Sequence, residues 1–129
     1  MSERIFTKAD NDGSSIFVFG SNTRGFHGAG AAKEARENWG AKQGVGFGRT
    51  GMTFAIPTKD HNILTRPIEA IGIDVFVFIN YAKDHPELRF LVTKIGCGLA
   101  GLSESDIAPM FANAPENCIL PDGWRTPQN

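Results

Sequence analysis

Two glycine-rich segments set the strongest limits on how this chain of 129 residues can fold. The first, residues 20–30, follows the apolar run Ile16-Phe17-Val18-Phe19, and the second, residues 96–101, follows an apolar run over residues 88–95. After each segment, apolar residues recur at helical spacing. A buried strand that leads through glycines into a helix is typical of layered α/β domains. Ala, Phe, Trp and charged residues separate the glycines, which excludes a flexible linker.

The remaining pattern alternates in the same way. Between residues 67 and 85, apolar residues at helical spacing favour a helix that begins at Pro67, although the β-branched and aromatic run inside it also suits a strand. The other expected elements are a helix over 28–38, a strand over 54–56 that Pro57 ends, a helix capped by the Ser103/Asp106 box, and a strand over 119–120. We therefore expect one α/β domain over residues 1–129.

Composition excludes several classes of protein. Apolar residues make up 41% and charged residues 21% of the chain, which fits a globular domain and argues against disorder. The net charge of −1 argues against a general nucleic-acid binder. Two cysteines, no apolar leader and no apolar run long enough to span a bilayer predict a cytoplasmic protein without disulfides.

The first candidate site is the segment from Gly20 to Gly30. Backbone N–H groups at the start of a helix, freed of side chains by glycine, form a ready anion site, and the amide of Asn22 is suited to a ribose hydroxyl. A tight crossover without any ligand is the alternative. We favour the ligand, because open α/β sheets bind ligands where their strands end.

The second candidate is Ile95-Gly96-Cys97-Gly98-Leu99-Ala100-Gly101. It matches G-x-G-x-x-G by letter, and Asp122 follows at the distance of a dinucleotide fingerprint. Only eight residues follow Pro121, however, so the chain cannot complete a dinucleotide-binding half-domain. A phosphate-cradling loop of another kind fits better, and the P-loop NTPase pattern is absent.

The third candidate is Lys59, directly after the strand expected at 54–56. A lysine there can pair with a phosphate, act as a nucleophile, or simply be a surface residue. His27, His61 and His85 show no metal-ligand spacing, and we expect surface or hydrogen-bonding roles for them. Cys97 is a conceivable nucleophile, although small buried cysteines are common packing residues.

Taken together, these three segments resemble the macrodomain superfamily of ADP-ribose-binding modules. The resemblance rests on Asn22-Thr23-Arg24-Gly25-Phe26-His27-Gly28-Ala29-Gly30, Phe54-Ala55-Ile56-Pro57-Thr58-Lys59 and Ile95-Gly96-Cys97-Gly98-Leu99-Ala100-Gly101-Leu102. It is strongest to the branch of terminal ADP-ribose glycohydrolases and of antitoxins that remove ADP-ribose from DNA. The chain also resembles small macro-like proteins of phages.

The resemblance implies a three-layer α/β/α fold with a mixed sheet and ADP-ribose in a crevice at the strand ends. It implies that Lys59 attacks or polarises the anomeric carbon of the linked ribose, on DNA or on a protein carboxylate, with no cofactor or metal. The ligand-binding residues implied are Asn22, Gly25, Gly28, Gly30, Gly96, Cys97, Gly98, Leu99, Ala100 and Gly101. The alternative is a non-catalytic module that binds and sequesters the nucleotide, for example a phage accessory protein.

Two positions depart from the family pattern. The aspartate that usually binds the adenine amino group is missing from its turn, since the N-terminal segment offers only Asp10 and Asp12. Ala100 stands where the glycohydrolases carry an aspartate in the phosphate loop.

Overall fold

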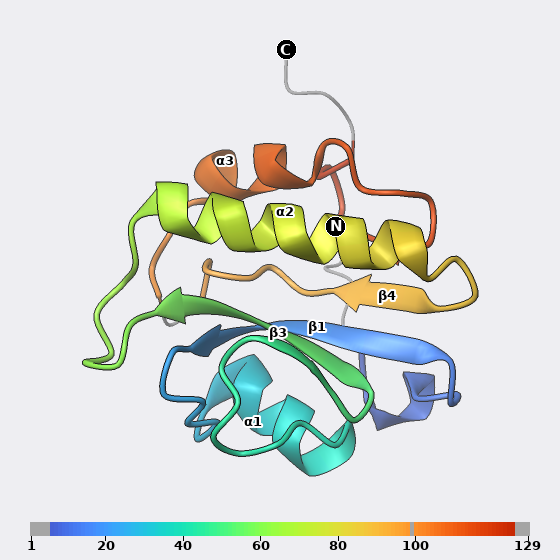
Figure 1. Cartoon of the computed structure of the whole chain (residues 1–129), viewed down its shortest axis with the longest axis horizontal. Coiled ribbons are helices and arrows are strands. Elements are labelled where there is room, and N and C mark those ends of the chain that lie inside the picture. The colour runs from blue at the N-terminus through green and yellow to red at the C-terminus, as the bar shows by residue number, and fades with distance from the viewer. Residues whose placement is uncertain (1–5, 99, 126–129) are drawn as a thin grey trace.

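The structure, a computed structural model, describes residues 6–98 and 100–125 (Figure 1). Its elements in chain order are η1 (Lys8–Asp10), β1 (Ser15–Asn22), α1 (Gly30–Asn38), β2 (Gly48–Thr50), β3 (Thr53–Lys59), α2 (Ile68–Asp84), β4 (Arg89–Val92), α3 (Glu104–Ile107), η2 (Ala108–Phe111) and β5 (Cys118–Ile119). The five strands form one sheet in the order β2-β3-β1-β4-β5, in which only β2 runs antiparallel to its neighbour. The expected α/β class with a mixed sheet is confirmed.

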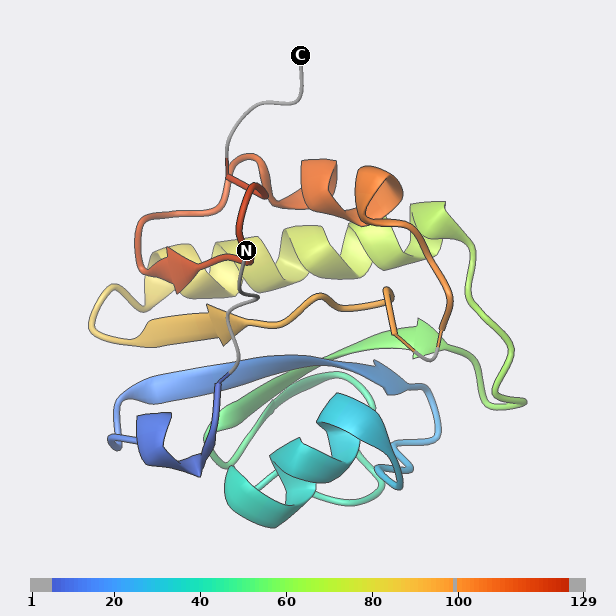
Figure 2. The ribbon, with the colours of Figure 1, turned by 180° about the vertical axis from the view of Figure 1, so that it is seen from behind.

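Helices cover both faces of this sheet, as Figures 1 and 2 show. On one face, Ala32 and Ala35 of α1 belong to a buried cluster with Phe17 and Phe19 of β1. Small side chains let this helix lie close to the strands. On the other face, the apolar stripe of α2, which includes Ile71, Val75 and Phe78, packs on the opposite side of β1 and β3. Alternate residues of β1 therefore serve two separate apolar layers.

The stripe at residues 67–85 is resolved as a helix, but the expectation that Pro57 ends a strand is wrong. β3 continues through Pro57 to Lys59. Its antiparallel neighbour β2 pairs only as far as Ala55, so Pro57 lies where that edge of β3 carries no ladder and a missing N–H costs little. On its other edge, Pro57 is in register with Ser21 of β1.

Two further boundaries differ from expectation. β1 runs past Gly20 to Asn22, because Gly20 stays in register with Ile56 of β3. The helix expected after Ser103 is a single α-turn followed by a 3-10 turn, since Pro109 cannot continue an α-helix. Ser103 caps it by accepting a hydrogen bond from the Ser105 amide, without the reciprocal bond from the Ser103 N–H to the Asp106 carboxylate that a capping box requires.

Among residues 6–98 and 100–125, no helix has the length and apolar character needed to cross a membrane.

Candidate functional site

A cavity of about 620 Å³ lies where β1, β3 and β4 end. These strands are parallel, so their carboxyl ends meet at one edge of the sheet. The chain leaves β1 for α1 on one face and β3 for α2 on the other, which opens a crevice between the two exits. The wall is built from the ends of these strands, the start of α1, and the loops over residues 59–66 and 93–101.

Two lysines supply all the charge on this wall within the part of the chain that the structure describes. Lys59 is the last residue of β3, and Lys94 follows β4. Lys94 is held by Glu104, with 3.1 Å between its Nζ and the carboxylate oxygen. No described Asp or Glu lines the cavity itself, and Glu104 offsets the charge of Lys94. The field that favours an anionic ligand therefore comes chiefly from Lys59.

The N-terminus of α1 adds to this field. Its N-cap residue, Ala29, makes no side-chain cap hydrogen bond, and the first turn holds no acidic residue. Gly30, Ala31 and Ala32, the first residues of the helix, all line the cavity. A helix start without a capping side chain presents N–H groups and the positive end of the helix dipole, which together bind anions.

The structure brings together most of the residues expected at the site. Those that line the cavity are Asn22, Gly28, Gly30, Lys59, Gly96, Gly98 and Ala100. Gly25, Cys97 and Gly101 do not line it, and Leu99 lies outside the described residues.

Gly25 has a packing role. Its φ is +71°, and a Cβ there would lie 2.3 Å from backbone atoms of Gly44 and Val45. Only glycine lets these two loops touch.

Cys97 is not suited to be a nucleophile. Its thiol lies 3.5 Å from the Ile95 carbonyl, and burial raises the pKa of the thiol. A raised pKa leaves less of the reactive thiolate at neutral pH.

Asn22 acts on its own loop. Its Nδ2 donates to the Phe26 carbonyl (2.9 Å), and its Oδ1 accepts from the Phe26 N–H (3.0 Å). The amide that we expected on a ribose hydroxyl is therefore engaged in shaping the loop, which holds the Phe26 ring at the cavity wall with 57% of its surface exposed.

Ser21 and His27 form a buried pair beside the cavity that the sequence did not predict. His27 Nε2 lies 3.2 Å from Ser21 Oγ, the ring stands edge-on to Phe19, and the side chain is fully buried. Burial lowers the pKa of His27, so its imidazole is neutral near pH 7. Ser21 lines the cavity, and the buried His27 ring holds the Ser21 hydroxyl in position.

Lys94 was also missed, although its signal resembled that of Lys59. Each lysine lies two or three residues after a short apolar run, Phe54–Ile56 for Lys59 and Phe90–Val92 for Lys94. The expected strand over 88–95 included Lys94 within it, whereas β4 ends at Val92 and releases Lys94 to the cavity edge.

A second cavity of about 500 Å³ adjoins the first. The two share Gly30, Ala31, Thr93 and Lys94, so they meet beside the start of α1. The second is lined by apolar residues, including Phe6, Phe17 and Val92, and by polar ones, including Lys8, Glu34 and Asn38.

Neither early aspartate reaches this second cavity. The Asp10 carboxylate accepts from the Thr7 N–H (2.8 Å), and Asp12 accepts from the Ser14 N–H (3.0 Å). Both therefore stabilise local turns.

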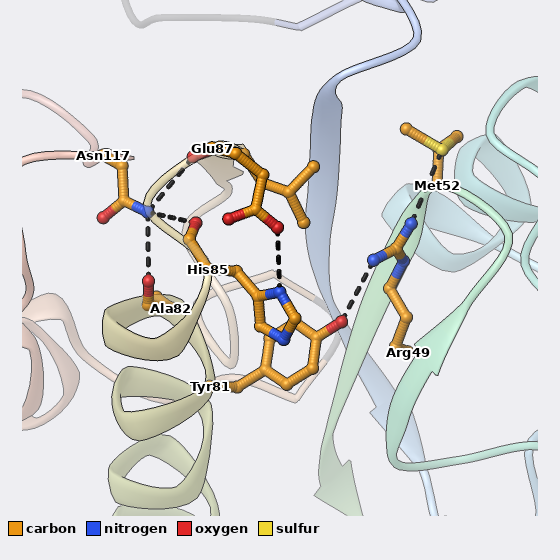
Figure 3. Close-up of polar contacts among 8 residues, drawn as sticks. Arg49, Met52, Tyr81, Ala82, His85, Glu87 and Asn117 are labelled. Atoms are coloured by element: carbon orange, nitrogen blue, oxygen red, sulfur yellow. Dashed lines mark hydrogen bonds and ion pairs between the residues drawn. The ribbon is translucent and has the colours of Figure 1, made fainter.

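A separate polar cluster lies at the other end of α2 (Figure 3). Arg49 donates to the Tyr81 hydroxyl (3.0 Å), His85 stacks on the Tyr81 ring, and Glu87 pairs with His85 (3.1 Å). These groups bind one another beside the amino ends of the parallel strands, opposite the end that carries the cavities. Among the described residues, no group of three or more His, Cys, Asp or Glu side chains could hold a metal ion.

Comparison of the chain with protein-family models, with curated proteins and with solved structures finds no match.

Proposed function

We propose that this protein binds ADP-ribose, or a closely related nucleotide, across the two adjoining cavities. The observation that carries the proposal is the wall of the larger cavity, where lysines are the only charged groups described and α1 begins without a capping side chain. A diphosphate suits the junction beside the α1 start and Lys94. The base then occupies the second cavity, where Phe6 forms part of the wall, and the terminal ribose lies in the first, near Lys59.

The layering of the fold and the position of the crevice both support this proposal. A mixed sheet with α1 on one face and α2 on the other supports a three-layer, macrodomain-like arrangement, which we propose as its fold. The crevice lies at the strand ends, where the resemblance places ADP-ribose.

Hydrolysis through Lys59 is the more demanding part of the proposal. In it, the deprotonated Lys59 amine attacks the anomeric carbon of an ADP-ribose linked to DNA or to a protein carboxylate, and the bond from that carbon to the acceptor breaks as the acceptor leaves. Water then hydrolyses the bond between Lys59 and the sugar, which releases free ADP-ribose and restores the amine. One observation favours a second candidate, a non-catalytic nucleotide-binding module. No described carboxylate lines the cavity, so none is in place to move protons during release of a lysine adduct.

Replacing Gly98 tests the binding site. Gly98 lines the cavity, its backbone lies outside the left-handed region, and a Cβ there would meet no atom within 4 Å. Gly98→Glu therefore adds a negative charge at the wall without strain. Calorimetry should show ADP-ribose binding by the parent and none by Gly98→Glu, with both proteins melting within a few degrees of each other.

Gly98→Gln is the matched control, since it adds the same bulk without charge. It should retain measurable binding. If Gly98→Glu binds as tightly as the parent, the phosphate does not lie against this loop, and the proposed function fails.

A further inference from the structure

Ile63 has a backbone conformation that its residue type disfavours. Its φ is +64°, and within residues 6–98 and 100–125 it is the sole non-glycine residue with a positive φ. A β-branched side chain in the left-handed region is a steric outlier, because its Cβ crowds the neighbouring backbone. Such strain persists only where the surrounding structure enforces it.

Asp60 enforces this turn. Its carboxylate Oδ1 accepts from the N–H groups of Asn62 (2.8 Å) and Leu64 (3.0 Å), its carbonyl accepts from the Ile63 N–H (3.0 Å), and its own N–H donates to the Leu64 carbonyl (2.8 Å). The hydrogen bond from Leu64 holds the pKa of Asp60 below its usual range, so the carboxylate stays charged and bonded at neutral pH.

Residues 60–66 are also tied to both walls of the cavity. Thr65 Oγ1 donates to the Ala100 carbonyl (2.8 Å) in the glycine loop after β4, and Arg24 Nη1 lies 3.5 Å from the His61 carbonyl. The turn is thereby fixed across the cavity edge, and Ile63 forms part of the lining.

The strain at Ile63 is not offset by burial inside the protein. Its side chain stays 41% exposed, although it is apolar. Phe26, the other exposed apolar side chain of the lining, is likewise positioned by polar bonds to its loop. A strained, half-exposed apolar residue at a cavity wall is explained if a ligand completes its burial.

We propose that Ile63 is a specificity-determining residue that packs its side chain against the terminal ribose of the ligand. This inference rests on the proposed ADP-ribose site. The isolated Lys59–Thr65 bridge brings the base of the turn together, and the proposed function places the terminal ribose near Lys59. Ile63 therefore distinguishes ADP-ribose from ADP, which lacks that sugar.

The test is the variant Ile63→Asn, because asparagine tolerates the left-handed region and removes the apolar surface. We expect its melting temperature to rise by about 3 °C as strain is relieved. We expect its affinity for ADP-ribose to fall about tenfold through the lost apolar contact, while its affinity for ADP stays unchanged.

Two controls separate strain from contact. Ile63→Val keeps both the strain and most of the apolar surface, so it should behave as the parent does. Leu64→Asn changes the neighbouring side chain, which is 63% exposed and does not line the cavity, so it should alter neither affinity nor, beyond about 1 °C, melting temperature.

Four results would overturn the inference. If Ile63→Asn binds ADP-ribose as tightly as the parent, the Ile63 side chain does not contact the ligand. If Ile63→Asn melts at a lower temperature than the parent, the backbone at Ile63 is not strained. An equal loss of affinity for ADP and ADP-ribose would place Ile63 away from the terminal ribose. If the parent binds no ADP-ribose while Ile63→Asn still melts higher, the strain is real but the proposed function fails, and this inference fails with it.

Discussion

At the scale of single residues, the glycines of this chain have different structural roles. Gly25 and Gly46 pack backbone against backbone, since a Cβ at either would lie under 2.5 Å from a neighbouring main-chain atom. Gly96 has a φ of +78° and shapes its turn, whereas Gly98 has open space and an ordinary backbone. Gly98 is therefore a position where a new side chain probes the cavity rather than the fold.

Lys59 is the residue on which catalysis depends. A phosphate clamp needs only positive charge, whereas a nucleophile must lose its proton, which arginine does not do. We predict that Lys59→Arg still binds ADP-ribose but loses several powers of ten in its rate of releasing ADP-ribose from modified DNA or carboxylate-linked protein. Release is measured by mass spectrometry of the acceptor.

The matched control is Lys33→Arg, because Lys33 is an exposed residue of α1 that lines neither cavity. This variant should release ADP-ribose at the parental rate. Release by Lys59→Arg at the parental rate would exclude the lysine nucleophile. A parent that binds tightly but releases nothing from either acceptor would leave the binding module as the function.

At the scale of elements, one side chain closes the end of the longest helix. Asn117 Nδ2 lies within 3.1 Å of the carbonyl oxygens of Ala82, His85 and Leu88, where α2 ends and the chain turns toward β4 (Figure 3). The Ala82 and His85 carbonyls also accept from the N–H groups of His85 and Leu88, so the amide adds bonds that tie the end of α2 to the turn before β4.

We predict that Asn117→Ala lowers the free energy of unfolding by about 2 kcal/mol, because the hydrogen bonds of the Asn117 amide to three carbonyls are lost. Urea denaturation measures the loss. Asn80→Ala, at an exposed position of the same helix, should change stability by less than about 0.5 kcal/mol. Equal stability of the two variants would show that Asn117 does not secure the end of α2.

The elements that the sequence predicted well are those whose signal is local. The helices at residues 28–38 and 67–85 carry apolar residues at helical spacing, and their observed bounds, Gly30–Asn38 and Ile68–Asp84, lie within two residues of expectation. The continuation of β3 through Pro57 was not predictable, because it depends on where the neighbouring strand β2 stops pairing.

The site residues divide in the same way, into those that a local sequence pattern predicted and those that depend on the folding of the chain. Lys59 and the glycines Gly28, Gly30, Gly96 and Gly98 lie together because parallel strands end at one edge, which the alternating pattern already implied. The burial of His27 against Phe19 arises because the loop after β1 folds back onto that strand, and the second cavity beside Phe6 arises from contacts between distant segments. The sequence carries no periodic signal for either.

At the scale of the whole molecule, the two ends of the sheet are chemically distinct. The carboxyl ends of β1, β3 and β4 carry the two cavities, the lysines and the uncapped start of α1. The amino ends lie beside the polar cluster of Arg49, Tyr81 and His85, whose groups are bonded to one another. Ligand binding should therefore perturb one end of the molecule and leave the other unchanged.

An NMR titration of the isotope-labelled protein with ADP-ribose tests this claim most directly, since every amide reports its own surroundings. The amides at the cavity should shift in a saturable way, namely those of Gly28, Gly30, Ala31, Gly96 and Gly98, while those of Tyr81, His85 and Asn117 stay in place. Signals that do not move at millimolar ADP-ribose, or that move only at the Tyr81 end, would contradict the account.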